Sequence, residues 1–119
     1  MKTVILDTNF LLHCITYKID FMQELRSILD ERFEVAVIDK TLNELEGKKN
    51  GTLAKALIRD LNIKLINASK EAKDVDTVLL TLQIPDIIVA TQDKALKEKL
   101  KKRGIEVITI RQKKYLMRV

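Results

Sequence analysis

The sequence predicts an α/β protein, a three-layer α/β/α sandwich in which helices cover both faces of a central parallel sheet of about five strands. Short β-branched runs alternate along the chain with amphipathic helical patterns, as in parallel sheets joined by crossover helices. No repeat, low-complexity stretch or linker interrupts this alternation. With 119 residues, the chain is expected to form one domain over residues 1–119 with a single core.

The strands are expected where short apolar runs rich in Val and Ile occur, at residues 3–6, 34–38, 64–66, 87–90 and 106–110. Between the first two runs lie helical stretches, the clearest with Phe21, Met22, Leu25, Ile28 and Leu29 at i, i+3/i+4, i+7 spacing. The order of the strands within the sheet does not follow from these patterns.

Four more helices are expected between the later strands. One begins near residues 39–41 and ends about Gly47, and another begins at Gly51 and carries Leu53, Leu57 and Leu61. A helix over residues 76–83 leads through Pro85, the only proline, into the fourth strand. The last begins after Asp93, places Leu96 and Leu100 inside with lysines outside, and ends at Gly104.

Composition restricts the functional classes. Apolar residues make up 46% and charged residues 33% of the chain, which is typical of a folded soluble protein. The longest apolar runs are a few residues long and the N-terminus lacks a signal-peptide pattern, so neither a membrane span nor secretion is expected. The single cysteine, Cys14, fits a cytoplasmic protein.

Charge is distributed unevenly along the chain. Residues 94–119 contain ten Lys and Arg against two Glu, a net +8, so the formal +5 of the chain leaves −3 for residues 1–93. An acidic body with a basic C-terminal quarter suits an anionic partner near an acid-lined site. A solvated helix face explains a run such as KALKEKLKKR equally well.

Acidic residues follow four of the expected strands. Because the carboxyl ends of parallel strands meet at one edge of a sheet, these carboxylates should come from separate segments to one rim, where such folds bind ligands. They are Asp7 after the first strand, Asp39, Glu44 and Glu46 after the second, Asp74 and Asp76 after the third, and Asp93 after the fourth.

Two explanations compete for these acids. Asp, Thr and Asn are favoured helix N-caps, and the stretch from Thr41 to Glu44 fits a capping box. Alternatively, Asp7 and Asp93 end apolar strands, are partly buried near the sheet centre, and repel each other unless a cation neutralises them. Oxygen ligands without Cys or His suit Mg²⁺ or Mn²⁺, so metal binding is favoured over capping.

The sequence offers few residues for other kinds of catalytic or phosphate-binding site. The only histidine, His13, is expected to pack on the first helix, and Cys14 beside it is expected in the core. The three glycines form no glycine-rich phosphate-binding loop.

Four stretches in order resemble the PIN-domain nucleases across nearly the whole chain, namely ILDTNFLL, IDKTLNELEG, KDVDTVLL and IIVATQDKALKEKLKKRGIEVITI. The likeness is greatest to small archaeal PIN proteins related to the rRNA-processing members. The resemblance implies an α/β/α sandwich, an acidic pocket for one or two Mg²⁺ or Mn²⁺ ions, and hydrolysis of single-stranded RNA. The rRNA-processing relatives carry two adjacent aspartates at the third motif, whereas here the second is Thr77.

The resemblance also assigns roles to residues. The catalytic and metal-binding acids fall on Asp7, Glu44, Asp76 and Asp93, and the pocket is supported by Thr8, Asn9, Thr91 and Asp74. The residues expected to bind RNA phosphates are Lys97, Lys101, Lys102, Arg103, Arg111, Lys113 and Lys114.

Three functions are consistent with these observations. The first is a ribonuclease acting on rRNA or another stable RNA. The second is a VapC-type toxin ribonuclease paired with an antitoxin. The third is a PIN-like scaffold that binds RNA or protein without cutting it, which Thr77 favours. The expected partners are RNA, a second copy of the chain, and an antitoxin or a ribosome-assembly factor.

Overall fold

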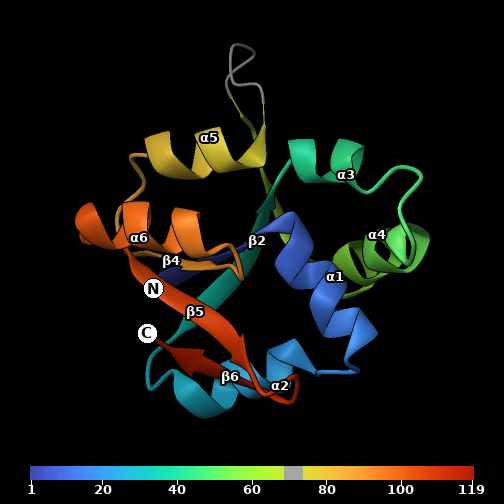
Figure 1. Ribbon diagram of the computed structural model, residues 1–119, viewed down its shortest axis with the longest axis horizontal. Helices are drawn as coiled ribbons and strands as arrows, with labels where there is room; N and C mark the ends of the chain where they lie inside the picture. The colour runs from blue at the N-terminus through green and yellow to red at the C-terminus, as the bar shows by residue number, and fades with distance from the viewer. Residues whose placement is uncertain (69–73) are drawn as a thin grey trace.

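The computed structural model describes residues 1–68 and 74–119, and Lys73 of the KDVDTVLL stretch lies outside these ranges. Its elements follow one another as β1 (Lys2–Leu6), α1 (Thr8–Thr16), α2 (Phe21–Ile28), β2 (Phe33–Ile38), α3 (Lys40–Glu44), α4 (Gly51–Asp60), β3 (Lys64–Ile66), α5 (Val75–Thr81), β4 (Ile87–Ala90), α6 (Lys94–Lys102), β5 (Glu106–Arg111) and β6 (Tyr115–Arg118) (Figure 1). Among the described residues, no helix is long and apolar enough to cross a membrane.

A single sheet of six strands, in the order β3-β2-β1-β4-β5-β6, forms the centre of the fold. Its first five strands are parallel, as predicted, whereas β6 pairs antiparallel with β5. The prediction of five strands missed β6 because only Leu116 of this edge strand is buried. The three apolar residues of this strand, Tyr115 to Met117, lie among Lys and Arg residues, so the segment resembled a basic tail. The side chain of Arg118 on this strand binds Glu106 of β5, with 2.8 Å between Nε and Oε1.

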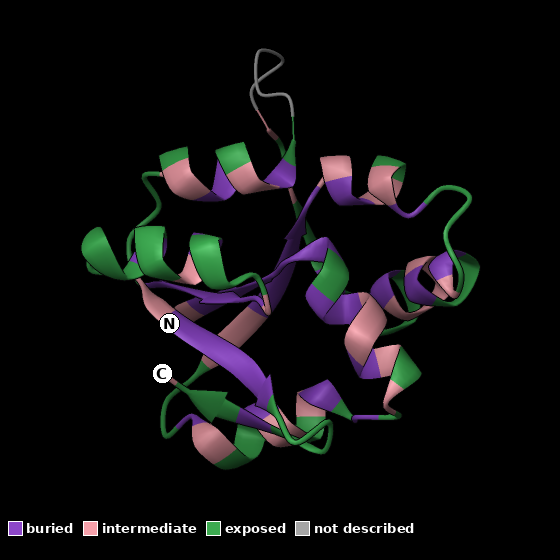
Figure 2. Ribbon diagram, viewed as in Figure 1, coloured by how far each residue is buried: buried purple, intermediate pink, exposed green. Residues whose placement is uncertain are grey.

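Side chains of the central strands alternate between two cores, one on each face of the sheet, as the two-residue period of a strand requires. On β1, Val4 and Leu6 belong to the core under α1, α2 and α4, whereas Ile5 belongs to the core under α5 and α6. β1 and β4 lie inside the protein, and exposed residues lie on the outer sides of the helices, in the turns and on the edge strands β3 and β6 (Figure 2). The predicted three-layer sandwich is therefore confirmed.

The strand order creates a switch point between β1 and β4. From β1 the chain moves outward through β2 to β3, then returns to place β4 on the other side of β1. In open α/β sheets, ligands bind at the carboxyl ends of the strands where the order reverses in this way. Asp7 follows β1 and Asp93 follows β4, so both stand at this switch point.

The apolar face of α4 differs from the predicted one. Leu53 and Leu61 are 50% and 40% exposed, whereas Ala54 and Ile58 are buried. The reason lies at Gly51, where a Cβ atom would stand 2.1 Å from the carbonyl oxygen of Leu45. This close approach turns the Gly51 side of α4 inward, and Ala54 and Ile58 lie on that side. The leucines therefore face outward.

Several smaller predictions are confirmed. Leu96 and Leu100 of α6 are buried, and Gly104, with a φ of +74°, follows the end of this helix. Cys14 lies in the core, where burial raises the pKa of its thiol to about 12. His13 lies on α1 and stacks on Tyr17.

Candidate active site

Asp7 lies at the centre of the switch point and is 5% exposed. Its Oδ1 accepts a hydrogen bond from the amide of Thr8 at 2.9 Å, so it caps α1. Its Oδ2 accepts a second bond, at 2.8 Å, from the hydroxyl of Thr91. Asp7 therefore caps α1 and also belongs to the candidate site, although the sequence analysis considered these roles as alternatives.

Thr91 joins the two strands of the switch point. It is fully buried, directly follows β4, and donates to Asp7 while its hydroxyl oxygen accepts from the amide of Asp93 at 3.1 Å. The neighbouring Gln92 turns toward β5, where its Oε1 accepts from the amide of Ile110 at 2.6 Å. Thr91 thus serves the site, whereas Gln92 holds the end of β4 to β5.

Glu44 is brought to the same edge by α3 and is held by two other segments, α1 and the start of α5. Its Oε1 accepts from the hydroxyl of Thr8 at 2.7 Å, and its Oε2 accepts from the amide of Val75 at 3.3 Å. The Thr8 hydroxyl also lies 3.1 Å from that of Thr41. Since Thr8 has one hydroxyl proton and gives it to Glu44, Thr41 must be the donor to Thr8.

The capping box proposed for residues 41–44 is wrong. The helix begins at Lys40, one residue before Thr41, and the Thr41 hydroxyl and the Glu44 carboxylate both point to Thr8 instead of to their own backbone. Asp39 makes no cap either, and its Oδ1 accepts from the amide of Ala68 at 3.0 Å.

The remaining acids stand at the starts of α5 and α6. Asp93 caps α6 by accepting from the amide of Leu96 at 3.0 Å, and Asp74 caps α5 by accepting from the amide of Thr77 at 2.8 Å. Asp76, in the first turn of α5, is half-buried. Asp93 is exposed, contrary to the expected partial burial, because it lies three residues beyond the end of β4. Asn9 is exposed on the first turn of α1.

Electrostatics shows that these carboxylates face one another. Burial, followed by the charges of Asp76 and Glu44, raises the pKa of Asp7 to about 6, although the bonds from Thr91 and Thr8 lower it. Burial raises the pKa of Asp76 too, followed by the charges of Asp93, Asp74 and Glu44, whereas Lys99 lowers it. Four segments therefore concentrate negative charge at one edge, as predicted from the sequence.

The donor types of this cluster suit Mg²⁺ or Mn²⁺. Carboxylates that raise one another's pKa are stabilised by a shared cation, and hard divalent cations prefer oxygen ligands. As the side chains stand, however, no three Asp, Glu, His or Cys residues within 1–68 and 74–119 are grouped closely enough to hold one ion. Both oxygens of Asp7 and of Glu44 accept hydrogen bonds, which accounts for part of this separation.

The structure divides the expected RNA-binding residues into two groups. Arg111, Lys113 and Lys114 are exposed at the carboxyl end of β5, on the same edge of the sheet as Asp7. The other group lies on α6, which runs back from this edge toward the start of β5; Lys97 is in its second turn, whereas Lys101, Lys102 and Arg103 are at its far end. Since α6 is about 13 Å long, these last three stand well away from Asp93.

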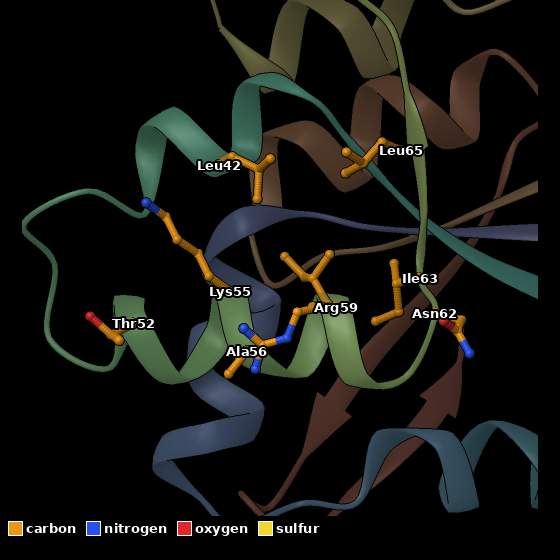
Figure 3. A pocket seen from close by; sticks show the side chains of 9 residues that line it. Leu42, Thr52, Lys55, Ala56, Arg59, Asn62, Ile63 and Leu65 are labelled. Carbon is orange, nitrogen blue, oxygen red and sulfur yellow. The ribbon is translucent and has the colours of Figure 1, made fainter.

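An apolar cavity of about 770 Å³ lies elsewhere, between α3, α4 and β3 (Figure 3). None of the residues that line it is acidic; they are Leu42, Thr52, Lys55, Ala56, Ile58, Arg59, Asn62, Ile63 and Leu65. Apolar pockets are common ligand sites, but this one offers no carboxylate that could hold a metal ion. The chemistry of the molecule is therefore sought at the acidic edge.

Two residues of the acidic edge were missed by the sequence analysis. Thr41 is fully buried and supports Thr8, and Lys99 acts on Asp76 from α6. The position of Lys99, three residues after the buried Leu96, was the available signal, because residues i and i+3 share a helix face. Thr41 was assigned to a capping box, and nothing in the sequence indicated that its hydroxyl supports Thr8 instead.

Comparisons with known proteins agree with this geometry. The family described as "PIN like domain" matches residues 4–113. The chain is 34% identical over 124 residues to Ribonuclease VapC4 of Methanocaldococcus jannaschii, covering 97% of this chain and 95% of that protein. It is 32% identical over 112 residues to the rRNA-processing protein FCF1 of Saccharomyces cerevisiae, covering 90% of this chain but 59% of that longer protein.

A solved structure shares the fold. The PIN domain endonuclease Utp24 superimposes with a TM-score of 0.84 at 26% identity, covering 98% of this chain and 92% of that one. The similarity thus extends over nearly all the elements described above.

Proposed function

We propose, starting from the fact that this chain belongs to the PIN-like domain family, that it is a metal-dependent ribonuclease that hydrolyses phosphodiester bonds of single-stranded RNA. One observation carries the proposal. At the switch point between β1 and β4, carboxylates from four segments lie near one another, so their charges help to raise the pKa of Asp7 and of Asp76, and buried threonines hold Asp7 and Glu44. The names of its relatives, a VapC ribonuclease, an rRNA-processing protein and an endonuclease, support the same reaction class.

The residues that would hold Mg²⁺ or Mn²⁺ are Asp7, Glu44, Asp76 and Asp93. When bound, such an ion supplies an activated water and neutralises charge on the phosphate. Without the ion, the same carboxylates repel the RNA backbone, so both binding near the site and cleavage should depend on it.

The protein's own groups orient these acids. Thr91 and the amide of Thr8 fix the two oxygens of Asp7, and the Thr41–Thr8 pair fixes Glu44. Lys99 offsets part of the charge around Asp76. Because the pKa of Asp7 is about 6, most molecules carry an ionised Asp7 above pH 7, ready for a cation.

The test is cleavage of a 5′-labelled, unstructured RNA by the native protein and by Asp7→Asn and Asp93→Asn, with Mn²⁺, Mg²⁺ or EDTA. The matched control is Asp30→Asn. Asp30 is exposed just before β2, at the amino ends of the strands, whereas the candidate site lies at their carboxyl ends. We expect cleavage only with metal, loss in both site variants and native activity in the control. Native-level cleavage by Asp7→Asn, or cleavage in EDTA, would contradict the proposal.

The biological role is proposed separately. Similarity to FCF1 and Utp24 supports processing of rRNA, whereas similarity to VapC4 over nearly the whole chain favours a toxin ribonuclease restrained by an antitoxin. An adjacent antitoxin reading frame, with growth arrest on expression of this chain alone, would identify the toxin.

The scaffold alternative is favoured by two features, Thr77 in place of an aspartate and the absence of three grouped metal ligands among the described residues. If the protein is a scaffold, Asp7→Asn should bind RNA as the native protein does, and neither of these two proteins should cleave it.

A further inference from the structure

We propose that one outer face of α1 and the turn between β5 and β6 form a track that guides single-stranded RNA away from the acidic edge. The track consists of Asn9, His13, Tyr17 and Lys113. The inference rests on the proposed ribonuclease function and adds a path for the substrate on one side of the site.

Two rings on α1 form the middle of the track. His13 and Tyr17 lie one turn apart, with ring centroids 5.8 Å apart and planes inclined by 19°. His13 Nδ1 is buried and has no hydrogen-bond partner within the described parts of the chain. Buried polar atoms of folded proteins are nearly always hydrogen-bonded. Because Nδ1 of His13 makes no such bond here, hydrogen bonding by this atom does not account for a histidine at this position. Both side chains are half-buried, and Tyr17 also packs against the core, so each ring presents only part of its surface to solvent. Aromatic surfaces are a sequence-tolerant support for nucleic-acid bases.

A cation completes the arrangement from a different part of the chain. Lys113 is exposed, and its Nζ lies 5.6 Å from the ring centroid of Tyr17. The exposed neighbours Arg111 and Lys114 add two more positive charges at this turn. The turn lies beside the corner between α1 and α2 in Figure 1. Stacking rings next to several cations match what a flexible, negatively charged strand of bases requires.

The turn that carries Lys113 has an unusual backbone. Gln112 and Lys113 have φ values of 52° and 56°, and the amide of Lys114 bonds the carbonyl of Arg111 at 3.0 Å. This left-handed pair is the form that Asn-Gly normally occupies in tight hairpins, because other side chains are strained there. A turn that keeps Gln-Lys in this conformation points to a use for the lysine side chain.

The track begins at the acids. Asn9 is exposed in the first turn of α1, two residues after Asp7, and Tyr17 caps the other end of the same helix. Since α1 has nine residues, the two ends stand about 13 Å apart, which a few nucleotides can span. A phosphate at the acids and later phosphates at Lys113 can therefore belong to one strand.

The alternative is that Tyr17 and Lys113 only attach the hairpin to α1. In that case, their removal would lower stability without changing RNA affinity. The two explanations differ in binding, so binding is the quantity to measure.

The experiment measures fluorescence anisotropy of a labelled, unstructured RNA of about 12 nucleotides, within the range of single-strand sites. Metal-free protein is used, so that the RNA stays intact. Tyr17 and Lys113 lie at the end of α1 away from the acids, so their share of the binding does not require the ion. We expect Tyr17→Leu to weaken binding about tenfold and Tyr17→Phe to leave it unchanged, because Phe keeps the stacking face. Lys113→Gln should lower the slope of log affinity against log salt by about 0.7.

Lys64→Gln is the matched charge control. Lys64 is exposed on β3, and β3 and β6 are the two outer strands on opposite sides of the sheet. The track is supported if Lys113→Gln lowers affinity and salt slope while Lys64→Gln does not. It is overturned if both substitutions have equal effects, or if folded Tyr17→Leu and Lys113→Gln bind as the native protein does.

Cleavage separates this inference from the proposed function. With Mn²⁺, the track variants should lose activity on RNA of about 12 nucleotides. They should keep native activity on a dinucleotide, which is too short to reach from the acids to Tyr17 and Lys113. If the track variants cleave RNA of both lengths as well as the native protein does, and only with metal, the proposed ribonuclease function is supported and the track is contradicted. A native protein that neither binds nor cleaves RNA would remove both.

Discussion

Thr91 donates a hydrogen bond of 2.8 Å to Oδ2 of Asp7, across the boundary between the first and fourth strands of the sheet. Both side chains are buried, and the same threonine oxygen accepts the amide of Asp93. One hydroxyl therefore sets the position of the buried Asp7 and of the loop that carries the exposed Asp93. A displacement of Thr91 would change both sides of the site together.

Thr91→Val should raise the pKa of Asp7 above about 6, because the lost hydrogen bond lowers that pKa in the native protein. Loss of the donor to a buried carboxylate should also reduce the free energy of unfolding by about 1–3 kcal/mol. NMR titration of the Asp7 carboxyl carbon and urea unfolding measure the two effects. Thr91→Ser keeps the hydroxyl and should restore the native pKa. An unchanged Asp7 pKa in Thr91→Val would refute the role of this bond.

Asp7 should make the metal-free protein less stable as pH rises. Its pKa is about 6 when folded against an ordinary value of 3.8, so the folded state binds the proton more tightly. The stabilisation is complete below about pH 4, is lost between pH 4 and 6, and amounts to about 3 kcal/mol.

The measurement is the free energy of unfolding of native protein and Asp7→Asn in EDTA from pH 4 to 8. We expect the difference between them to change across pH 4–6, with the variant gaining relative stability above pH 6. Mn²⁺ should stabilise only the native protein. A difference that stays constant with pH would contradict the burial of an ionisable Asp7.

Thr41→Val tests whether the buried Thr41 positions Glu44 through Thr8. We expect a loss of about 1 kcal/mol in stability and a severalfold weaker affinity for Mn²⁺, measured by calorimetry. The reason is that Thr8, which donates to Glu44, loses the hydrogen bond from Thr41 that holds it in place. Thr41→Ser should bind Mn²⁺ like the native protein. Thr3→Val is the matched control, because Thr3 also bonds a glutamate, Glu34, but at the opposite edge of the sheet. Equal Mn²⁺ affinity in all four proteins would show that Thr41 has only a structural role.

The sequence predicts most strongly those parts of the fold that repeat a pattern. The first five strands are recognisable because buried parallel strands are nearly continuous apolar runs. β6 is not, because its three apolar residues, Tyr115 to Met117, lie between Lys114 and Arg118 in a basic segment, and only Leu116 is buried. α4 was assigned the wrong face because the close approach of Gly51 to Leu45 outweighs the preference of leucines for burial.

The candidate site shows the same division. Strand ends placed Asp7 and Asp93 at one edge, since the carboxyl ends of parallel strands always meet there. The contacts of Thr41 and Lys99 depend on how separate elements pack, which no local pattern records. The exposure of Asp93 depends on the loop between β4 and α6 and was predicted incorrectly for that reason.

Thr77→Asp tests whether the departure from the family pattern weakens metal binding. Thr77 is exposed in the first turn of α5, next to Asp76, and its amide is capped by Asp74. A carboxylate there would add a ligand beside the acids and would interact favourably with the helix N-terminus, by about 0.3–1 kcal/mol. We therefore expect tighter Mn²⁺ binding and unchanged or higher stability in the presence of metal.

Without metal, the added charge should raise the pKa of Asp76 further, because Asp93, Asp74 and Glu44 already raise it. The control is Thr77→Asn, which has the same shape without the charge and should bind Mn²⁺ like the native protein. Calorimetric titration of the three proteins, followed by cleavage assays, gives the comparison. If Thr77→Asp binds Mn²⁺ no better than Thr77→Asn, position 77 does not face the cluster, and Asp7, Glu44, Asp76 and Asp93 alone would define the proposed metal site.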